Sequence, residues 1–434
     1  MNTHRVTSMI SIFSGLAFLC ANAALADDSP GVDPRTTSTQ WRDDKTNLEI
    51  VRKLNQAYGR VPFSQDYEGM LNERPFEISW SVGPNLPVTW KGGVAGLIDG
   101  QIVIAGGMWM PARENLTYVY DLKTKTYEKL PSPPVRPQYT QGTCDGRAIY
   151  IVGGRGSGRR VLKLARDEKR EWKWSDLAPL PQEEGNGRWL GTVSLVSGKW
   201  LIVVAGTPTG APSEKGVKPQ LPDYCLNLEQ PQAEWERIAT YPGGPRSVLQ
   251  STAVGDKMYV FGGSNNDPVM RSLYVELITK YGIRVPYNGV PNYRDAYRYD
   301  PEADRWETLR RLPFPVIAGS AVPVDDNHIL LMGSADTPTY RVGKSKRNPG
   351  VEIKDGDLTS RWRGYGDRIV CYDIDRDNYS HVGVMPYGVA TVPWIFDGAR
   401  LYAFGGEPSH GFNMNTENVL QIGTLNRTDG TKTD

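Results

Sequence analysis

A short apolar run near the C-terminus ends in side chains that could transfer protons. Glu407 comes directly after Leu401–Gly406, and His410 lies three residues further on. A carboxylate can take a proton from a hydroxyl group and return it to a neighbouring oxygen, which is general acid–base catalysis. We therefore predict Glu407 as a catalytic candidate. His410 can bind a ligand or exchange protons near physiological pH, although a lone loop histidine is more often an ordinary surface residue.

Arginine and aromatic side chains gather near the ends of other apolar runs. Arginine binds carboxylates with two parallel hydrogen bonds, and aromatic rings offer flat apolar surfaces to sugar rings. This set therefore suits an anionic sugar. The alternative is structural, because such arginines can pair with carboxylates of neighbouring repeats and hold the fold together. The ligand-binding candidates are Arg113, Arg136, Arg155, Arg188, Arg246, Trp109, Tyr139 and Trp189.

These residues belong to a repeat in which a tight turn precedes four apolar residues and a pair of small residues. One such unit cannot bury its own apolar surface, so neighbouring units must stack. The turns, such as Asp99–Gly100 and Asp397–Gly398, are typical of β-hairpins. The copies are Ile102–Gly107, Ile149–Gly154, Leu201–Gly206, Met258–Gly263, Ile329–Ser334 and Leu401–Gly406.

A fourth strand in each unit carries an aromatic residue and ends at an apolar residue followed by proline, which cannot donate to a strand ladder. The first of these strands, near Trp80, precedes the first small pair, and the last small pair has no such strand after it. A closed ring resolves this mismatch. We predict that Phe76–Pro87 completes the final unit beside Val419–Gly423, which removes exposed sheet edges.

Together these signatures resemble the kelch repeat over residues 76–425. The resemblance implies an all-β, six-bladed propeller closed by N- and C-terminal strands. Strand polarity then puts the loops after the small pairs on one face, where the insertions at roughly 207–223, 264–295 and 335–367 would surround a central pocket.

Within the kelch proteins, three stretches are similar to bacterial sialic-acid mutarotases, which are N-acetylneuraminate epimerases. That resemblance implies a glutamate just after a small-pair strand and an arginine several residues on. Here Ser334 occupies the glutamate position, Asp336 can substitute for it, and Arg341 lies downstream, so Asp336 and Arg341 are further catalytic candidates. The similar stretches are Tyr241–Arg246, Ala318–Ala335 and Leu401–Glu407 with Asn418–Leu420.

The N-terminus predicts export. Arg5, an apolar run from Met9 to Cys20 and the small-x-small pattern at Ala24–Ala26 indicate a signal peptide over residues 1–26, with a rival cleavage site after Ala23. Secretion or a periplasmic location follows. Residues 27–75 form a polar extension with one short helix, opened by a capping box at Thr46–Glu49. Residues 426–434 form a C-terminal tail.

The balance of charged residues limits the kinds of binding partner that we expect. Lys and Arg number 50 against 49 Asp and Glu, so a nucleic acid or a membrane surface is not expected as the main partner. We expect no membrane insertion, no cofactor and no metal, because the four histidines are too few and too scattered for a copper site. Cys144, Cys225 and Cys371 read as free thiols. The predicted partner is a small sugar or glycan. A non-catalytic propeller that binds a glycan or a protein is the alternative.

Overall fold

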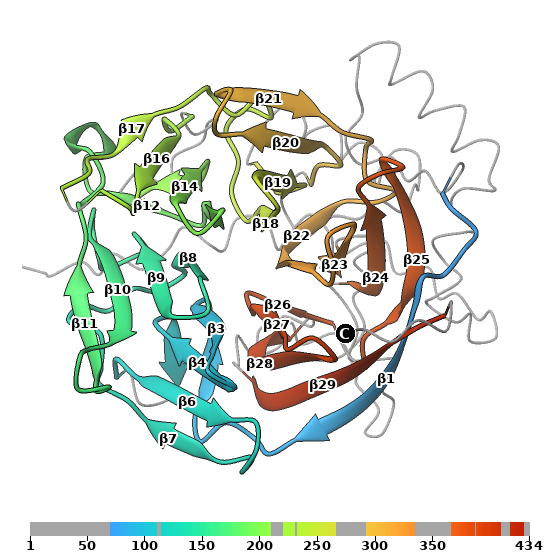
Figure 1. Ribbon diagram of the computed structural model, residues 1–434, viewed down its shortest axis with the longest axis horizontal. Coiled ribbons are helices and arrows are strands. Elements are labelled where there is room, and N and C mark those ends of the chain that lie inside the picture. The colour runs from blue at the N-terminus through green and yellow to red at the C-terminus, as the bar shows by residue number, and fades with distance from the viewer. Residues whose placement is uncertain are drawn as a thin grey trace, which may run out of the picture.

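In the computed structural model, the described residues are 70–110, 114–209, 220–230, 232–265, 292–334, 366–386, 388–408 and 417–428. Six antiparallel sheets lie around a central axis like the blades of a propeller (Figure 1). The predicted all-β, six-bladed fold is confirmed.

Each blade has four strands, ordered from the axis outward. Blade 1 contains β3 (Val94–Ile98), β4 (Gln101–Ala105), β6 (Thr117–Asp121) and β7 (Tyr127–Lys129). Blade 2 contains β8 (Gln141–Cys144), β9 (Ala148–Val152), β10 (Val161–Arg166) and β11 (Trp172–Asp176). Blade 3 contains β13 (Thr192–Val196), β14 (Trp200–Val204), β16 (Tyr224–Asn227) and β17 (Glu236–Arg237).

The remaining blades follow the same plan. Blade 4 contains β18 (Gln250–Val254), β19 (Lys257–Phe261), β20 (Ala296–Asp300) and β21 (Arg305–Thr308). Blade 5 contains β22 (Val316–Pro323), β23 (His328–Ser334), β24 (Gly366–Asp373) and β25 (Asn378–Val384). Blade 6 contains β27 (Trp394–Phe396), β28 (Arg400–Pro408), β29 (Glu417–Arg427) and β1 (Phe76–Gly83).

Short elements extend the blades. Strand β2 (Thr89–Lys91) pairs with β5 (Met108–Met110), and β12 (Arg188–Trp189) pairs with β15 (Thr207–Pro208). Strand β26 (Val389–Ala390) pairs with the end of β28. A 3-10 helix, η1, spans Gln182–Glu184.

Strands from both ends of the repeat region close the ring. Strand β1 pairs antiparallel with β29, from Phe76 opposite Arg427 to Gly83 opposite Leu420. In Figure 1 the two strands run side by side along the outer edge of blade 6. The predicted closure, with the segment near Trp80 completing the last blade, is confirmed.

The small pairs let adjacent blades approach closely. Both glycines of Gly262–Gly263 have positive φ, and the Gly263 N–H donates to the Val316 carbonyl of the next blade at 2.9 Å. A Cβ on Gly262 would lie 2.2 Å from that carbonyl oxygen, so no side chain fits there. The same inter-blade bond joins Gly107 to Pro137, Gly154 to Arg188 and Gly206 to Arg246.

A ring of backbone hydrogen bonds surrounds the axis. One residue at the entry to each innermost strand has φ between 46° and 65°, and the six are Gly92, Tyr139, Leu190, Val248, Ala318 and Thr391. Each blade donates an N–H from this position to the corresponding carbonyl of the preceding blade, at 2.6–3.3 Å; in blade 2 the donor is the next residue, Thr140. The hydrogen bonds offset the strain of the left-handed backbone. We call this set the inner ring.

Aromatic side chains join the blades at the periphery. The indole N–H of Trp306 donates to the Ala239 carbonyl of the preceding blade at 2.8 Å, and the Tyr379 hydroxyl donates to the Arg310 carbonyl at 2.7 Å. The aromatic residues of the outermost strands therefore bond between blades. The remaining described pairs are Tyr127 with Pro84, Trp174 with Pro131 and Trp235 with Ala178.

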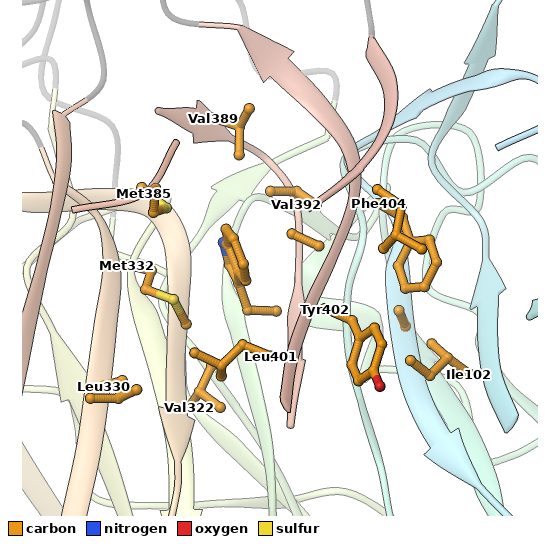
Figure 2. Packing of buried hydrophobic residues seen from close by; sticks show 14 of the residues in the cluster. Ile102, Val322, Leu330, Met332, Met385, Val389, Val392, Leu401, Tyr402 and Phe404 are labelled. Carbon is orange, nitrogen blue, oxygen red and sulfur yellow. The ribbon is translucent and has the colours of Figure 1, made fainter. Parts of the chain in front are cut away.

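The core lies between neighbouring blades. Figure 2 shows Leu401 and Phe404 of β28 between side chains of blade 5, such as Met332, and Ile102 of blade 1. All four side chains are fully buried. Because blade 6 contributes to both interfaces, it packs the two ends of the ring against each other.

Several predicted segments lie in parts of the chain that the structure does not describe. The signal peptide, the short helix, most of each predicted insertion and most of the tail lie outside the described residues. In the described segments, no helix combines the length and apolar character needed to cross a lipid bilayer. Cys144, Cys225 and Cys371 carry free thiols on strands β8, β16 and β24.

An acidic residue ties the closing strand to blade 5. Asp325, in the turn between β22 and β23, accepts a hydrogen bond from Arg427 of β29 and lies 2.9 Å from His328 Nδ1. Burial alone would raise the pKa of Asp325, but the hydrogen bonds from His328 and Asn327 and the charge of Arg427 lower it to about 2. The carboxylate therefore stabilises the closed ring.

We expect Gly262→Ala to lower the free energy of unfolding by about 2 kcal/mol or more, because the new Cβ meets the Val316 carbonyl. Gly255→Ala is the matched control, since Gly255 also has positive φ but a Cβ added there would meet nothing within 4 Å. Urea unfolding measures both. Equal losses would show that backbone strain, and not the close approach of blades, explains the small pair.

We expect Asp325→Asn to destabilise the protein at pH 6 and to have little effect near pH 2. The pKa of Asp325 is lower in the folded protein than the unfolded value of about 3.9, so its contribution is complete above pH 4 and lost as pH falls toward 2. Thermal melts at pH 6, 4 and 2.5 measure this. Asp99→Asn, on an exposed turn, is the control. A destabilisation of the same size at every pH contradicts the assignment.

Candidate functional site

A cavity of about 460 Å³ lies on the propeller axis. The six innermost strands and the inner ring line it, with one segment from each blade. Tyr139, Leu190 and the other inner-ring residues form the wall at one mouth, and Leu97, Pro323 and Phe396 lie at the opposite ends of their strands. Small-molecule sites in proteins are typically cavities of this size.

An ion pair lies beside the inner ring. The Lys91 Nζ is 3.1 Å from a Glu407 carboxylate oxygen, and the two side chains are 1% and 18% exposed. Lys91 ends strand β2 directly before Gly92, and Glu407 on β28 pairs with Ala390, directly before Thr391. Both residues therefore sit at the mouth that the inner ring surrounds.

Aromatic and cationic side chains continue from this pair across blades 2 and 3. Lys91 Nζ lies 5.7 Å from the centre of the Tyr139 ring, which meets the Trp189 ring edge to face at 6.1 Å. The exposed Arg155 guanidinium lies over Trp189 at 5.8 Å. We call Lys91, Glu407, Tyr139, Trp189 and Arg155 the mouth cluster. It brings together four of the residues predicted from sequence.

The environment keeps the Tyr139 hydroxyl protonated. Burial raises the pKa of Tyr139, and the charge of Glu407 raises it further, while Lys91 and Arg155 act in the opposite direction. A neutral phenol can donate a hydrogen bond or a proton. The cluster thus combines a carboxylate, an ammonium group and a protonated phenol at one mouth of the cavity.

Three predicted ligand-binding residues lie inside the blades instead. Arg188 is completely buried and donates to the Ala205 carbonyl at 2.9 Å. Arg246 is 6% exposed and pairs with Asp295 at 2.5 Å. Trp109 is completely buried against Trp90, with ring centres 5.6 Å apart. The contacts of the two arginines are structural, but they lie within their own blades, whereas the structural alternative expected pairs with carboxylates of neighbouring blades.

Arg188 and Arg246 occupy a position that serves the fold. In blade 1 the same repeat position holds Trp90, whose indole N–H donates to the Gly106 carbonyl at 2.9 Å. Arg246 Nη1 donates to the Gly262 carbonyl at 3.2 Å in the same way. In blades 1, 3 and 4, the side chain two residues before the inner ring thus donates a hydrogen bond to the first carbonyl of the small pair in its own blade.

Arg136 lies closer to the mouth cluster. Its carbonyl would be 2.8 Å from a Cβ on Gly156, which follows Arg155, so the two segments touch. The Arg136 side chain is half-buried. Arg113, Asp336, Arg341 and His410 lie outside the described residues, so their predicted roles remain predictions.

Sequence reasoning missed Lys91. It stands one residue before the inner ring, as Trp189 does in blade 3. Aligning the blades on their small pairs places Lys91 opposite Leu190, one residue from the predicted Trp189, because the hairpin of blade 3 is one residue longer than that of blade 1. The ion pair itself had no sequence signal, because Lys91 and Glu407 come from opposite ends of the repeat region.

Cys144 is the thiol that lines the cavity. Burial raises its pKa to about 11, so it is a thiol and not a nucleophilic thiolate at neutral pH. Over the described ranges, no three His, Cys, Asp or Glu side chains gather as a metal ion would require.

Sequence comparisons identify two related families. Residues 90–134, which include blade 1, match the Kelch motif, and residues 220–342 match the N-acetylneuraminate epimerase family. The second match extends from the outer part of blade 3 into the segment after β23.

Three similar proteins are named N-acetylneuraminate epimerase. The one from Escherichia coli is 26% identical over 199 residues, covering 43% of this chain and 48% of that protein. The one from Pasteurella multocida is 31% identical over 43% of this chain and 47% of that protein. The one from Yersinia enterocolitica is 24% identical over 55% of this chain and 62% of that protein.

The chain thus spans about half the length of the curated relatives it matches. The repeated small pairs, the six blades and the Kelch match agree with one another. The protein is a six-bladed β-propeller that matches the Kelch motif in the region of blade 1 and resembles the N-acetylneuraminate epimerases over part of its length.

Proposed function

We propose that this protein is an exported mutarotase that interconverts the anomers of an acidic sugar of the sialic acid type. The observation that carries the proposal is the mouth cluster, which places the Glu407 carboxylate, the Lys91 ammonium and the Tyr139 phenol beside a cavity of small-molecule size. The names of the similar proteins support the choice of sugar.

Mutarotation requires only reversible proton transfer. In the proposed reaction, Glu407 takes the proton of the anomeric hydroxyl as the bond between the anomeric carbon and the ring oxygen breaks, which leaves a keto group. The Tyr139 hydroxyl gives its proton to the ring oxygen, and Lys91 and Arg155 stabilise the resulting phenolate. The ring then closes when its oxygen attacks the other face of the keto group. Both proton transfers are reversed, so Glu407 is again a carboxylate and Tyr139 again a phenol.

The same cluster explains why an acidic sugar would be held. Arg155 lies over Trp189 and forms no ion pair among the contacts of the described residues, so its guanidinium is available to a carboxylate. Trp189 and Tyr139 offer rings to the apolar face of a sugar. Lys91, by contrast, is already neutralised by Glu407.

We expect Glu407→Gln to reduce the catalysed rate by about 100-fold or more, because the amide cannot accept the proton. Proton NMR of anomer exchange in N-acetylneuraminic acid, with the spontaneous rate subtracted, measures this. Glu307→Gln is the matched control: Glu307 is also paired with a cation, Arg298, but on blade 4 away from the axis. Anomer exchange that the wild-type protein does not accelerate would remove the proposal.

We expect Lys91→Met to reduce the catalysed rate by about tenfold or more, since it leaves Glu407 without its counter-charge and the phenolate without its nearest cation. Lys163→Met is the control, because Lys163 lies over the Tyr150 ring at the same 5.7 Å on the outer part of blade 2. A wild-type rate in Lys91→Met contradicts this role.

A non-catalytic sugar-binding propeller is the second candidate. It is favoured by Ser334, which stands where the mutarotase resemblance implies a glutamate. Tight binding of N-acetylneuraminic acid without faster anomer exchange would support this candidate instead.

A further inference from the structure

The central cavity below the mouth cluster has a neutral wall. Among the described residues that line it, none is Asp, Glu, Lys, Arg or His, although the charged residues Lys91 and Glu407 lie at its mouth. A charged group of a ligand would find no counter-charge inside, and its desolvation would be unfavourable. The part of a ligand that enters the cavity is therefore uncharged.

Hydroxyl groups are abundant on this wall. The Ser251 hydroxyl contacts those of Thr192 and Ser194 in the neighbouring blade, the latter at 3.0 Å. Thr143 and Thr252 occupy the same repeat position in blades 2 and 4, four residues after the inner ring. The hydroxyl-bearing lining residues are Thr140, Thr143, Thr192, Ser194, Ser251, Thr252, Ser320 and Thr391, besides Tyr139.

Polar atoms of the wall also lack hydrogen-bond partners. Gln141 and Gln250 are 6% and 1% exposed, and both line the cavity. Among the described residues, Gln141 Nε2, Gln250 Oε1 and Thr391 Oγ1 form no hydrogen bond, but these atoms are covered by protein and are not exposed to the cavity. Gln250 Nε2 donates to the Met332 and Gly333 carbonyls of the next blade. Unpaired buried groups of this kind are unfavourable. A ligand would therefore meet the partly exposed hydroxyl groups of the wall, such as those of Thr143 and Thr252, and each of these can donate and accept.

We infer that the central cavity is a subsite for the neutral polyhydroxyl side chain of the sugar, which enters between the blades while the anomeric centre and carboxylate stay at the mouth cluster. The inference rests on the proposed function for the orientation of the sugar. Tyr139 fixes that orientation, because it belongs to the mouth cluster and also lines the cavity. The ligand class is a sugar acid with a hydroxylated carbon chain attached to its ring.

The test compares two sugars. N-acetylneuraminic acid carries a three-carbon hydroxylated side chain. Its seven-carbon analogue is made from a glycoside by periodate cleavage and borohydride reduction, followed by hydrolysis of the glycoside. It has lost two of the side-chain carbons and keeps the carboxylate and the anomeric centre. We expect kcat/KM for anomer exchange to fall about tenfold or more with the short sugar, which corresponds to one or two lost hydrogen bonds. Equal values for the two sugars overturn the inference and leave the proposed function standing.

Cavity variants provide the second measurement. Thr143→Leu and Thr252→Leu fill the cavity, and Thr143→Val and Thr252→Val remove only the hydroxyl groups. Thr126→Val, on the outer hairpin of blade 1, is the control. We expect the cavity variants to abolish the preference for the longer sugar and Thr126→Val to keep it. A preference that survives in both leucine variants overturns the inference.

Saturation-transfer NMR separates binding from catalysis. With N-acetylneuraminic acid, the side-chain protons should receive the strongest saturation from the wild-type protein and lose it in Thr252→Leu. This readout holds even if the protein binds the sugar without accelerating anomer exchange. Saturation confined to the ring protons, or no saturation at all, overturns the inference.

Discussion

The ring of backbone hydrogen bonds around the axis is the constraint on which the remaining structure depends. It requires one residue in each blade to adopt a left-handed backbone, and in five of the six blades that residue is not glycine. Each residue is held by the blade before it and holds the blade after it. The strain is therefore tolerable only when all six blades are present, so the ring favours a closed assembly over an open stack.

Much of the fold could be predicted because its signals are local and repeated. The small pairs are glycine-rich since a carbonyl of the next blade occupies the space of a side chain, as Val316 does beside Gly262. The displaced phase of the Trp80 strand indicated closure by β1 and β29. The inner ring could not be predicted, because Tyr139, Leu190 and Val248 have no preference for positive φ and adopt it under tertiary contacts.

The candidate site was predictable only in part, for a related reason. Residue type identified Glu407, Tyr139, Trp189 and Arg155, but type alone could not separate them from Arg188 and Arg246, which cap carbonyls inside their own blades. Burial makes that distinction, and it changes from one residue to the next: Arg188, two residues before the inner ring, is completely buried, whereas Trp189, one residue before it, is only partly buried. Lys91 shows the reverse case, an unremarked lysine whose importance comes from a partner more than 300 residues away.

Charge is segregated along the axis. Ionic groups lie at one mouth, and the described residues of the interior are uncharged, with hydroxyl, amide and apolar side chains. Such an arrangement orients a ligand by its chemistry, since a charged end is favoured at the mouth and a neutral hydroxylated end is favoured inside. The scaffold thereby uses the same innermost strands both to join the blades and to distinguish the two ends of a bound molecule.

The pairing of β1 with β29 also has a consequence for biosynthesis. Phe76 emerges from the ribosome about 350 residues before its partner Arg427, so the first strand must wait for almost the whole chain before its ladder can form. During that interval β1 lacks the three inner strands of blade 6, and its edges are exposed to other chains. Productive folding of this protein therefore depends on keeping one early strand unpaired until its partner β29 is available.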